Sequence, residues 1–339
     1  MIVPLMKKKI LLLVPDDYSL YILIEKNLKE LSFEVTTILH NSVRFKYKNI
    51  SQRLSNLFRK LIDGNTNYKK KLKEIHTAEC LVKKIDEYSQ FDYCLVIRAD
   101  FFHDDVLRKA KEKSDSLVSY HYDGLQRNPS IYNKIPLFDR FYVFDEEDLI
   151  ADGKVTTYLS HNFYFDYNEG EERHLIYDLY FLGFYNETRE ELLLKFFDLA
   201  KRCLGNVKFQ VVFLPKDMDR LPEYERRGIE CLTDLVPFEE YLQRVEQAKV
   251  IVDFVISDHK GLSFRIFEGV KYQKRVITTN ANVVKYDFYT PDNFYVLDYD
   301  SLNEEELLKF VNTPFKPIDE SVRLKYSFSC WIKDVLNIK

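Results

Sequence analysis

The stretch DLYFLGFYNETREELLLKFFDLAKRCLGNVKFQVVFL, residues 178–214, contains the pattern that decides the fold. Residues 178–182 form a short apolar run, residues 187–203 repeat apolar side chains at helical spacing, and residues 208–214 form a second apolar run. Short apolar runs bounded by turn residues indicate buried strands, whereas apolar positions three and four apart indicate a helix. The stretch therefore predicts a strand–helix–strand unit of the kind that builds parallel sheets.

The same alternation extends in both directions along the chain. Further strands are predicted at 9–14, 33–39, 93–97, 117–120, 141–144, 228–231, 250–255 and 275–278. Further helices are predicted at 18–31, 78–88, 104–113, 238–247 and 263–271. This order is typical of doubly wound α/β sheets, and 339 residues exceed what one core usually holds.

We therefore expect two tandem Rossmann-like domains whose parallel sheets face a central cleft. The N-terminal domain is predicted at 1–165 and the C-terminal domain at 174–318, with the boundary in the polar stretch 166–173. The terminal helix, residues 319–339, is expected to cross back onto the first domain. Ligands of open α/β sheets bind at the carboxyl ends of the strands, so function is expected there.

Composition excludes several classes of protein. Hydrophobic residues make up 46% and charged residues 31%, which is typical of a packed globular chain. The net charge of −4 comes from interspersed charges, so no nucleic-acid partner is expected. Five scattered cysteines indicate reduced thiols, and the apolar run at 10–14 is too short for an export signal. These features predict a cytoplasmic protein without a membrane span.

The segment DHKGLSFRIFEGV, residues 258–270, is the strongest candidate for a ligand site. A polar loop with a glycine opens a predicted helix, whose free N–H groups and dipole attract anions. We expect Gly261 and Ser263 to receive a diphosphate that Lys260 and Arg265 neutralise. Glu268 is placed to accept hydrogen bonds from ribose hydroxyls, although a capping or salt-bridging role explains it equally well.

The order of a polar glycine loop, the helix FRIFEG at 264–269 and the strand RVITTN at 275–280 resembles the C-terminal donor-binding half of GT-B glycosyltransferases. The resemblance implies that 174–318 is the nucleotide-sugar donor domain and 1–165 the acceptor domain. It also implies that Glu268 binds the donor ribose or sugar and that nearby basic residues bind the diphosphate. One retaining subgroup carries a Glu-x7-Glu pair, which would require an acid where this chain has Lys260. The stereochemical outcome therefore stays open.

Two strand ends upstream offer further donor-binding candidates. Gly183 with Arg189 resembles the first strand and loop of the same GT-B half, where a glycine permits close approach of the donor. Lys216 follows the strand at 208–214 and supplies another basic group at a strand end.

The segments SYHYDG at 119–124 and FDRFYVFD at 138–145 resemble CgeB-like and related bacterial polysaccharide glycosyltransferases. The resemblance implies transfer of a sugar from a nucleotide sugar to a glycan or lipid-linked glycan acceptor. The products would be capsule, lipopolysaccharide or exopolysaccharide. The nucleotide sugar is a substrate, and no cofactor is expected.

Inverting sugar transfer needs a base that removes the acceptor proton. Asp123 or His121 could serve, although Asp123 also fits an Asp-Gly turn and His121 also fits a core or donor-positioning histidine. Asp17 follows the first strand and has the same placement at a strand end. Three other residues share that placement: Asp16, Arg98 and Asp100.

Acids and a histidine at 103–105 look like metal ligands, but acids at the start of a helix also favour its dipole. Helix dipoles and basic side chains can stabilise a leaving diphosphate, so we expect no metal. The basic amphipathic segment 44–73 fits either a solvated helix face or a surface for anionic lipid or a phosphorylated acceptor. That segment would permit peripheral contact with the inner membrane.

Tandem Rossmann-like domains alone also fit functions other than sugar transfer. A nucleotide-sugar epimerase of GT-B fold and a noncatalytic glycan- or nucleotide-binding protein remain as alternatives. A dehydrogenase is disfavoured because no G-x-G-x-x-G follows the first strand.

Overall fold

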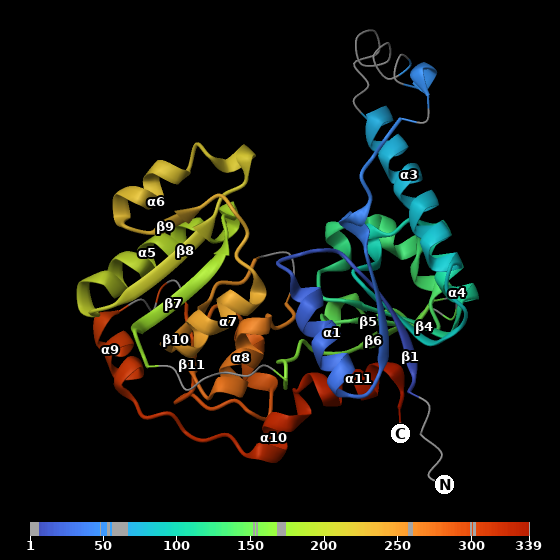
Figure 1. Cartoon of the computed structure of the whole chain (residues 1–339). Coiled ribbons are helices and arrows are strands. Elements are labelled where there is room, and N and C mark those ends of the chain that lie inside the picture. The colour runs from blue at the N-terminus through green and yellow to red at the C-terminus, as the bar shows by residue number, and fades with distance from the viewer. Residues whose placement is uncertain are drawn as a thin grey trace. The chain divides into compact units, whose positions relative to one another are not determined.

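The computed structural model describes residues 7–47, 49–52, 55, 67–151, 153, 155–167, 174–256, 260–298, 300 and 303–338 (Figure 1). The chain forms two compact units. The first comprises Met1–Asp17, Leu28–Val143 and Leu149–Tyr158, and the second comprises Tyr18–Asn27, Phe144–Asp148 and Leu159–Lys339.

The first unit is built on a six-stranded sheet. Its strands, in spatial order, are β2 (Glu34–Leu39), β1 (Lys9–Val14), β3 (Phe91–Ile97), β4 (Ser114–His121), β5 (Arg140–Val143) and β6 (Thr157–Leu159). β1 to β5 pair in parallel. The helices in this half of the chain are α1 (Leu20–Glu30), α3 (Asn67–Asp86) and α4 (Asp104–Glu112).

Alternate residues of the central strands form the core of the first unit. Leu11 and Leu13 of β1 and Val96 of β3 are fully buried in one apolar cluster. Two helices contribute to the same cluster, with Leu81 of α3 and Val106 of α4 also buried. Because side chains of a strand alternate between faces, these positions mark the face that α3 and α4 cover.

The second unit is built on another six-stranded sheet, in which every pair is parallel. Its strands, in spatial order, are β12 (Phe294–Val296), β11 (Arg275–Thr278), β10 (Ala248–Asp253), β7 (Tyr177–Phe184), β8 (Val207–Val212) and β9 (Glu230–Leu232). Its helices are α5 (Glu187–Cys203), α6 (Leu221–Arg227), α7 (Phe238–Glu246), α8 (Phe264–Tyr272), α9 (Glu304–Asn312), α10 (Glu320–Lys325) and α11 (Phe328–Leu336).

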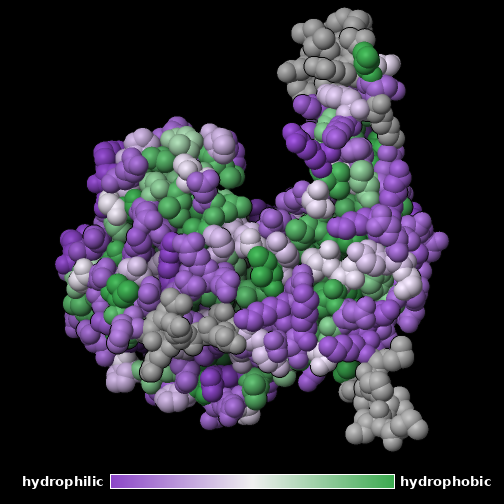
Figure 2. All heavy atoms as spheres, in the orientation of Figure 1, coloured by the Kyte–Doolittle hydropathy of each residue, from purple (hydrophilic) through white to green (hydrophobic). Residues whose placement is uncertain are grey.

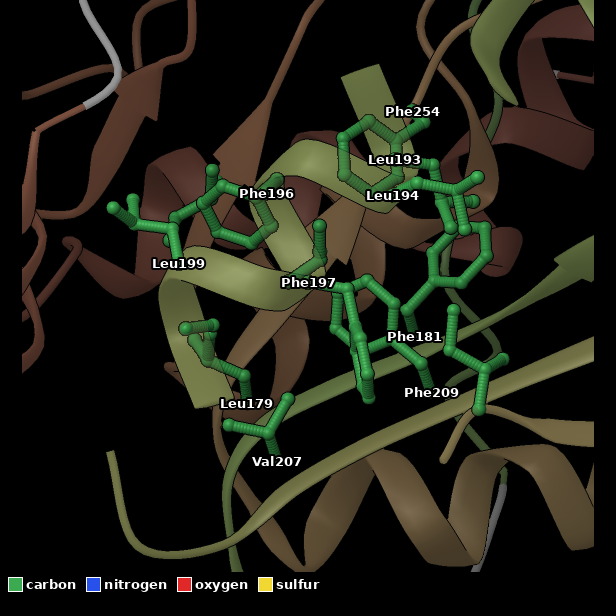
Figure 3. Close-up of a cluster of buried hydrophobic side chains, with 14 of the residues drawn as sticks. Leu179, Phe181, Leu193, Leu194, Phe196, Phe197, Leu199, Val207, Phe209 and Phe254 are labelled. Atoms are coloured by element: carbon green, nitrogen blue, oxygen red, sulfur yellow. The ribbon is translucent and has the colours of Figure 1, made fainter. Parts of the chain in front are cut away.

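Phenylalanine rings dominate the core between α5 and this sheet (Figure 3). Phe196 and Phe197 of α5 are buried against Phe181 of β7 and Phe209 of β8. The rings of Phe197 and Phe209 lie 5.2 Å apart, and those of Phe181 and Phe254 lie 5.3 Å apart. The aromatic-rich composition therefore serves packing in this core.

Short 3₁₀ helices connect many of these elements. They span His40–Ser42, Ala99–Phe101, Leu125–Arg127, Pro129–Asn133, Ile135–Leu137, Glu146–Asp148, Pro215–Asp217 and Ala281–Lys285. Among the residues that the structure describes, no helix is both long and apolar enough to span a membrane.

The predicted α/β fold with two parallel sheets is confirmed, and the bounds of α5 agree with the sequence pattern. The helix predicted at 78–88 is longer, because α3 already begins at Asn67. Four elements were not predicted from the sequence, namely α6, α9, β6 and β12. The two strands have three residues each and α6 has seven, which is too short for a clear periodic pattern, whereas α9 does bury Leu307, Phe310 and Val311 at helical spacing. Residues 168–173, in the predicted domain boundary, lie outside the described residues.

The C-terminal segment 320–336 forms two helices instead of one. Ser327 separates them, because its side chain accepts a hydrogen bond from Cys330 N at 3.2 Å and so caps α11. α11 is anchored within the second unit, where Phe328 N donates to Tyr164 O at 2.8 Å and the Trp331 ring lies 4.2 Å from that of Phe163. The expected crossing of this segment onto the first domain stays a prediction.

Candidate functional site

Each sheet reverses its strand order at one point, between β1 and β3 in the first unit and between β7 and β10 in the second. Such switch points leave a crevice at the carboxyl ends of the strands, where ligands of open α/β sheets bind. Polar side chains gather at both. The second-unit cluster comprises Arg189, Tyr241, Asp253, Arg265 and Glu268, and the first-unit cluster comprises Asp17, Arg98, Asp100, His121, Asp123 and Arg127.

Arg189 joins the two strand ends at the switch point of the second sheet. It lies in the first turn of α5, which begins where Asn186 accepts a hydrogen bond from Thr188 N. Its Nη1 donates to Phe254 O beyond β10 at 2.9 Å, and its Nη2 donates to Phe184 O at the end of β7. Two N–H groups of Arg189 thus donate hydrogen bonds to backbone carbonyls.

Gly183 makes room for this guanidinium. A Cβ atom at position 183 would lie 2.7 Å from Nη2 of Arg189 and 2.8 Å from the Phe181 ring. The structure therefore gives Gly183 a packing role beside Arg189, where the sequence suggested close approach of a ligand.

Arg265 lies beside Arg189, at the start of α8. It donates to Leu182 O, and its Nη1 is 3.5 Å from Asp253 Oδ1. The guanidinium carbons of Arg265 and Arg189 lie 5.6 and 5.4 Å from the centroid of the same Phe181 ring. Burial lowers the pKa of Arg189 to about 10, and the charge of Arg265 adds to the effect. The pKa of Arg265 is raised instead, because Tyr241, Asp253 and Glu268 outweigh the effect of burial. The two guanidiniums thus share one aromatic ring, and Asp253 partly compensates the charge of Arg265.

Glu268 is buried in the interior of α8, with 2% of its surface exposed. Its Oε2 accepts a hydrogen bond from the Tyr241 hydroxyl, whereas its Oε1 has no hydrogen-bond partner among the described residues. Burial raises the pKa of Glu268 to about 7. Its place inside the helix excludes a capping role, and the unpartnered oxygen can accept a hydroxyl hydrogen.

Asp253 and Asn280, which the sequence did not single out, hold the loop before α8. Asp253 Oδ1 accepts a hydrogen bond from Ser263 Oγ at 2.8 Å. Asn280 Nδ2 donates to the carbonyls of Lys260 and Gly261, at 3.0 and 3.1 Å. Both residues stand at the ends of parallel strands, β10 and β11, which is the signal that would have found them.

Lys260 and Gly261 contact the segment 144–148 of the same unit. The ammonium of Lys260 pairs with Glu147, and its side chain is 62% exposed. A Cβ atom at position 261 would overlap the Phe144 ring, so glycine is required there for packing. Asp258 and His259 of the same motif lie outside the described residues.

Lys216 is an exposed donor-site candidate beyond the end of β8, and its role stays a prediction. It lies on the 3₁₀ helix Pro215–Asp217 with 77% of its side chain exposed. Within the described part of the chain, its ammonium has one ion-pair partner, Asp217 at 4.0 Å.

In the first unit, Arg98 gathers the acidic side chains that follow β3 and β4. Its Nε and Nη2 each bind Asp100 at 2.9 Å, and its Nη1 lies 3.0 Å from Asp123. Arg127 binds the other oxygen of Asp123 at 2.8 Å. Arg98 has φ 58° and ψ 68°, a left-handed conformation that non-glycine residues rarely adopt and that is common at functional sites.

His121 is fully buried beside this pair, with Nδ1 3.7 Å from Asp100 Oδ1. Neither ring nitrogen has a hydrogen-bond partner among the residues that the structure describes. Burial lowers the pKa of His121 to about 4, so the ring is neutral near pH 7. A weakly basic, inaccessible imidazole fits the core-histidine interpretation better than the role of a general base.

Asp17 is the catalytic candidate whose environment best suits proton removal. It is partly exposed at the end of β1, and burial is the main cause that raises its pKa. Arg98 opposes that rise, whereas Asp100 adds to it. Asp123, by contrast, has both carboxylate oxygens bound by guanidinium groups. The first-unit cluster thus contains a carboxylate of raised pKa beside a structural ion-pair network.

The segment 103–105 forms a helix cap. His103 Nδ1 accepts a hydrogen bond from Asp105 N at 3.2 Å at the start of α4. Within the described ranges, no group of three or more histidine, cysteine or acidic side chains is arranged to hold a metal ion.

No protein-family model matches the chain, and no curated protein resembles it in sequence. Solved structures share its fold. A glycosyltransferase from Rickettsia africae is 15% identical, with a TM-score of 0.53 and 98% of each chain covered. A UDP-GlcNAc 2-epimerase from Methanocaldococcus jannaschii, solved with UDP-GlcNAc and UDP, is 13% identical, with a TM-score of 0.52 over 98% of this chain and all of the other.

A glycosyltransferase of avilamycin A biosynthesis is 10% identical, with a TM-score of 0.50 over 96% of this chain and 93% of its own. The two-domain GT-B fold expected from the resemblance is therefore confirmed. The finer resemblance to CgeB-like enzymes stays a prediction.

Proposed function

We propose that the chain is a glycosyltransferase that moves a sugar from a nucleoside-diphosphate donor to a glycan acceptor. The observation that carries this proposal is the pair of neighbouring guanidiniums, Arg189 and Arg265, at the switch point between β7 and β10. A diphosphate suits such a pair, because its negative charge balances guanidinium groups and its oxygens accept charge-assisted hydrogen bonds.

In this proposal Arg265 binds the diphosphate directly. Its side chain is 22% exposed, and the N-terminus of α8 adds positive potential beside it. Arg189 is a positioning residue that fixes the strand ends, and Glu268 accepts a hydrogen bond from a hydroxyl of the ribose or the sugar. The same positive groups stabilise the diphosphate as it leaves, so transfer would need no metal.

We assign proton removal to Asp17. In an inverting transfer the acceptor oxygen bonds to the anomeric carbon while the bond from that carbon to the diphosphate breaks, and Asp17 takes the hydroxyl proton. Its raised pKa favours that proton transfer near neutral pH. Asp123 and Arg98 would orient the acceptor hydroxyls.

The resemblance of residues 119–124 and 138–145 to polysaccharide transferases supports a bacterial surface glycan as the acceptor. We propose that the chain acts in the cytoplasm, in peripheral contact with the membrane. Lys69, Lys70, Lys71 and Lys73 of α3 support this, because they are exposed, and much of the visible surface of that helix is hydrophilic (Figure 2). Residues 48, 53–54 and 56–66 of the basic segment lie outside the described residues.

Calorimetric titration of the chain with UDP, GDP, CDP and dTDP and their sugars tests the donor site. We expect one nucleotide series to bind, and Arg265→Ala to weaken its affinity roughly 10- to 100-fold through loss of charge-assisted hydrogen bonds. Lys216→Ala, an exposed basic residue at a neighbouring strand end, is the control and should change the affinity less than about twofold. Absence of binding in every series would contradict the proposal and favour a noncatalytic binding protein.

A nucleotide-sugar epimerase is the second candidate, because the fold matches that of the archaeal epimerase as well as that of the transferase. An epimerase converts its nucleotide sugar without an acceptor. To distinguish the epimerase from the transferase, the nucleotide sugar that binds is incubated with the protein alone and the sugars are then analysed by chromatography. A new epimer in the absence of acceptor would replace the transferase proposal.

A further inference from the structure

A pocket of about 810 Å³ opens in the second unit. None of its lining residues belongs to the second-unit cluster. Its walls come from α10, α11, the chain after β11 and residues 159–161, and Glu146 closes one side. The proposed donor and acceptor chemistry leaves this pocket unexplained.

Aromatic rings form a continuous surface in the pocket. The Tyr326 ring lies 4.9 Å from that of His161 and 6.0 Å from that of Tyr286. Phe267 and Phe288 pack behind them, 5.7 Å from His161 and 4.9 Å from Tyr326. Because these two phenylalanines are buried, the surface is held rigidly in place.

His161 presents a hydrogen-bond acceptor to this pocket. Its Nδ1 lies 2.7 Å from the carbonyl of Asn162, a pairing that makes Nδ1 the donor and Nε2 the acceptor. Burial lowers the pKa of His161, which keeps the ring neutral near pH 7.

The pocket lining carries three lysines and three acidic residues, so its formal charge is balanced and does not select strongly for an anion or a cation. Lys285 lies 2.8 Å from Glu146, and Lys325 pairs with Asp287. Asp287 also accepts a hydrogen bond from the Tyr326 hydroxyl at 2.7 Å. The lining thus combines ammonium donors and carboxylate acceptors with aromatic rings.

We propose that this pocket binds a neutral saccharide unit. The apolar C–H face of a sugar ring fits an aromatic wall, and its hydroxyls need donors and acceptors close to one another, as found here. A phosphate group would have to compete with the carboxylates that already hold Lys285 and Lys325. The inference concerns binding alone and does not depend on the proposed transfer reaction.

Saturation-transfer NMR of the full chain with maltotriose, N-acetyllactosamine and N,N′-diacetylchitobiose tests the pocket. We expect transfer to at least one of these sugars, and transfer should persist in excess UDP. Tyr286→Ala and Asp287→Asn should each weaken the affinity by about fivefold or more, through loss of the ring surface and of an acceptor.

Matched controls come from the same unit. Tyr289→Ala and Asp292→Asn change a tyrosine and an ion-paired aspartate that do not line the pocket, and both should retain the affinity within about twofold. The proposal is overturned if none of the three sugars receives saturation, if UDP displaces the sugar, or if the pocket variants bind like the controls. Binding of inorganic pyrophosphate that Lys285→Ala abolishes would also overturn it, in favour of an anion site.

Discussion

The two strand-end clusters use arginine in opposite ways on the same type of sheet. In the first-unit cluster, Arg98 is bound by the carboxylates of Asp100 and Asp123, so its charge is compensated within the protein. In the second-unit cluster, Arg189 is bound by backbone carbonyls and lies beside Arg265.

This difference shows how one architecture can present two kinds of chemistry. Carboxylates around a neutralised arginine favour hydroxyl groups and proton removal. In the second-unit cluster carbonyls hold Arg189 and Asp253 lies beside Arg265, so two arginines share one ion-paired carboxylate and the surplus positive charge favours an anion. The comparison therefore supports an acceptor role for the first cluster and a donor role for the second.

The largest effect is expected on turnover when the carboxylate of Asp17 is lost. Asp17→Asn should lower kcat of sugar transfer by roughly 10²- to 10⁴-fold, because general-base catalysis contributes about that much. Nucleotide affinity should stay unchanged, as measured by calorimetry. Asp16→Asn, its neighbour after β1, is the control, and equal losses in both variants would remove Asp17 from the role of base.

Unfolding in urea tests the difference between the two arginines directly. Arg98→Met should lower the free energy of unfolding by about 3 to 5 kcal/mol, because it leaves buried carboxylates without their counter-charge. Arg189→Met should lower the free energy of unfolding by less than half as much. Burial already destabilises the charged guanidinium, so the removal of this charge offsets the loss of its two hydrogen bonds. Arg202→Met, on the exposed face of α5, should cost less than about 1 kcal/mol. Equal costs at Arg98 and Arg189 would contradict the comparison.

A smaller effect should appear in the pH dependence of stability. The pKa of Glu268 is about 7 in the folded chain against an ordinary value of 4.5, so the folded state binds its proton more tightly. Between pH 4.5 and pH 7 the unfolded chain releases this proton while the folded chain still binds it. The folded chain therefore loses about 2 to 3 kcal/mol relative to Glu268→Gln over that range, and little more above it. Urea titrations at pH 4.5 and pH 8 measure this loss. A constant difference between the two proteins would show that Glu268 ionises normally, and exposed Glu305→Gln serves as the control.

Much of the fold could be predicted because buried strands and amphipathic helices carry local patterns. α5, β1 and β11 lie at their predicted bounds for this reason. Some site residues were predictable from strand ends, because parallel strands bring their carboxyl ends to one edge of the sheet. The strand end at 178–183 pointed to Arg189 and the strand end at 208–214 pointed to Lys216, whereas the glycine loop and helix start at 258–270 pointed to Arg265 and Glu268.

The sequence by itself determined the two parallel sheets and the strand ends where polar residues collect, since these follow from the spacing of apolar residues along the chain. Only the tertiary structure decided the partner of each charged side chain. Arg98 and Asp123 meet across β3 and β4, and Arg189 reaches Phe254 from 65 residues away. Burial and charge pairing act through space, so the raised pKa of Glu268 and the lowered pKa of His121 have no signal in local sequence.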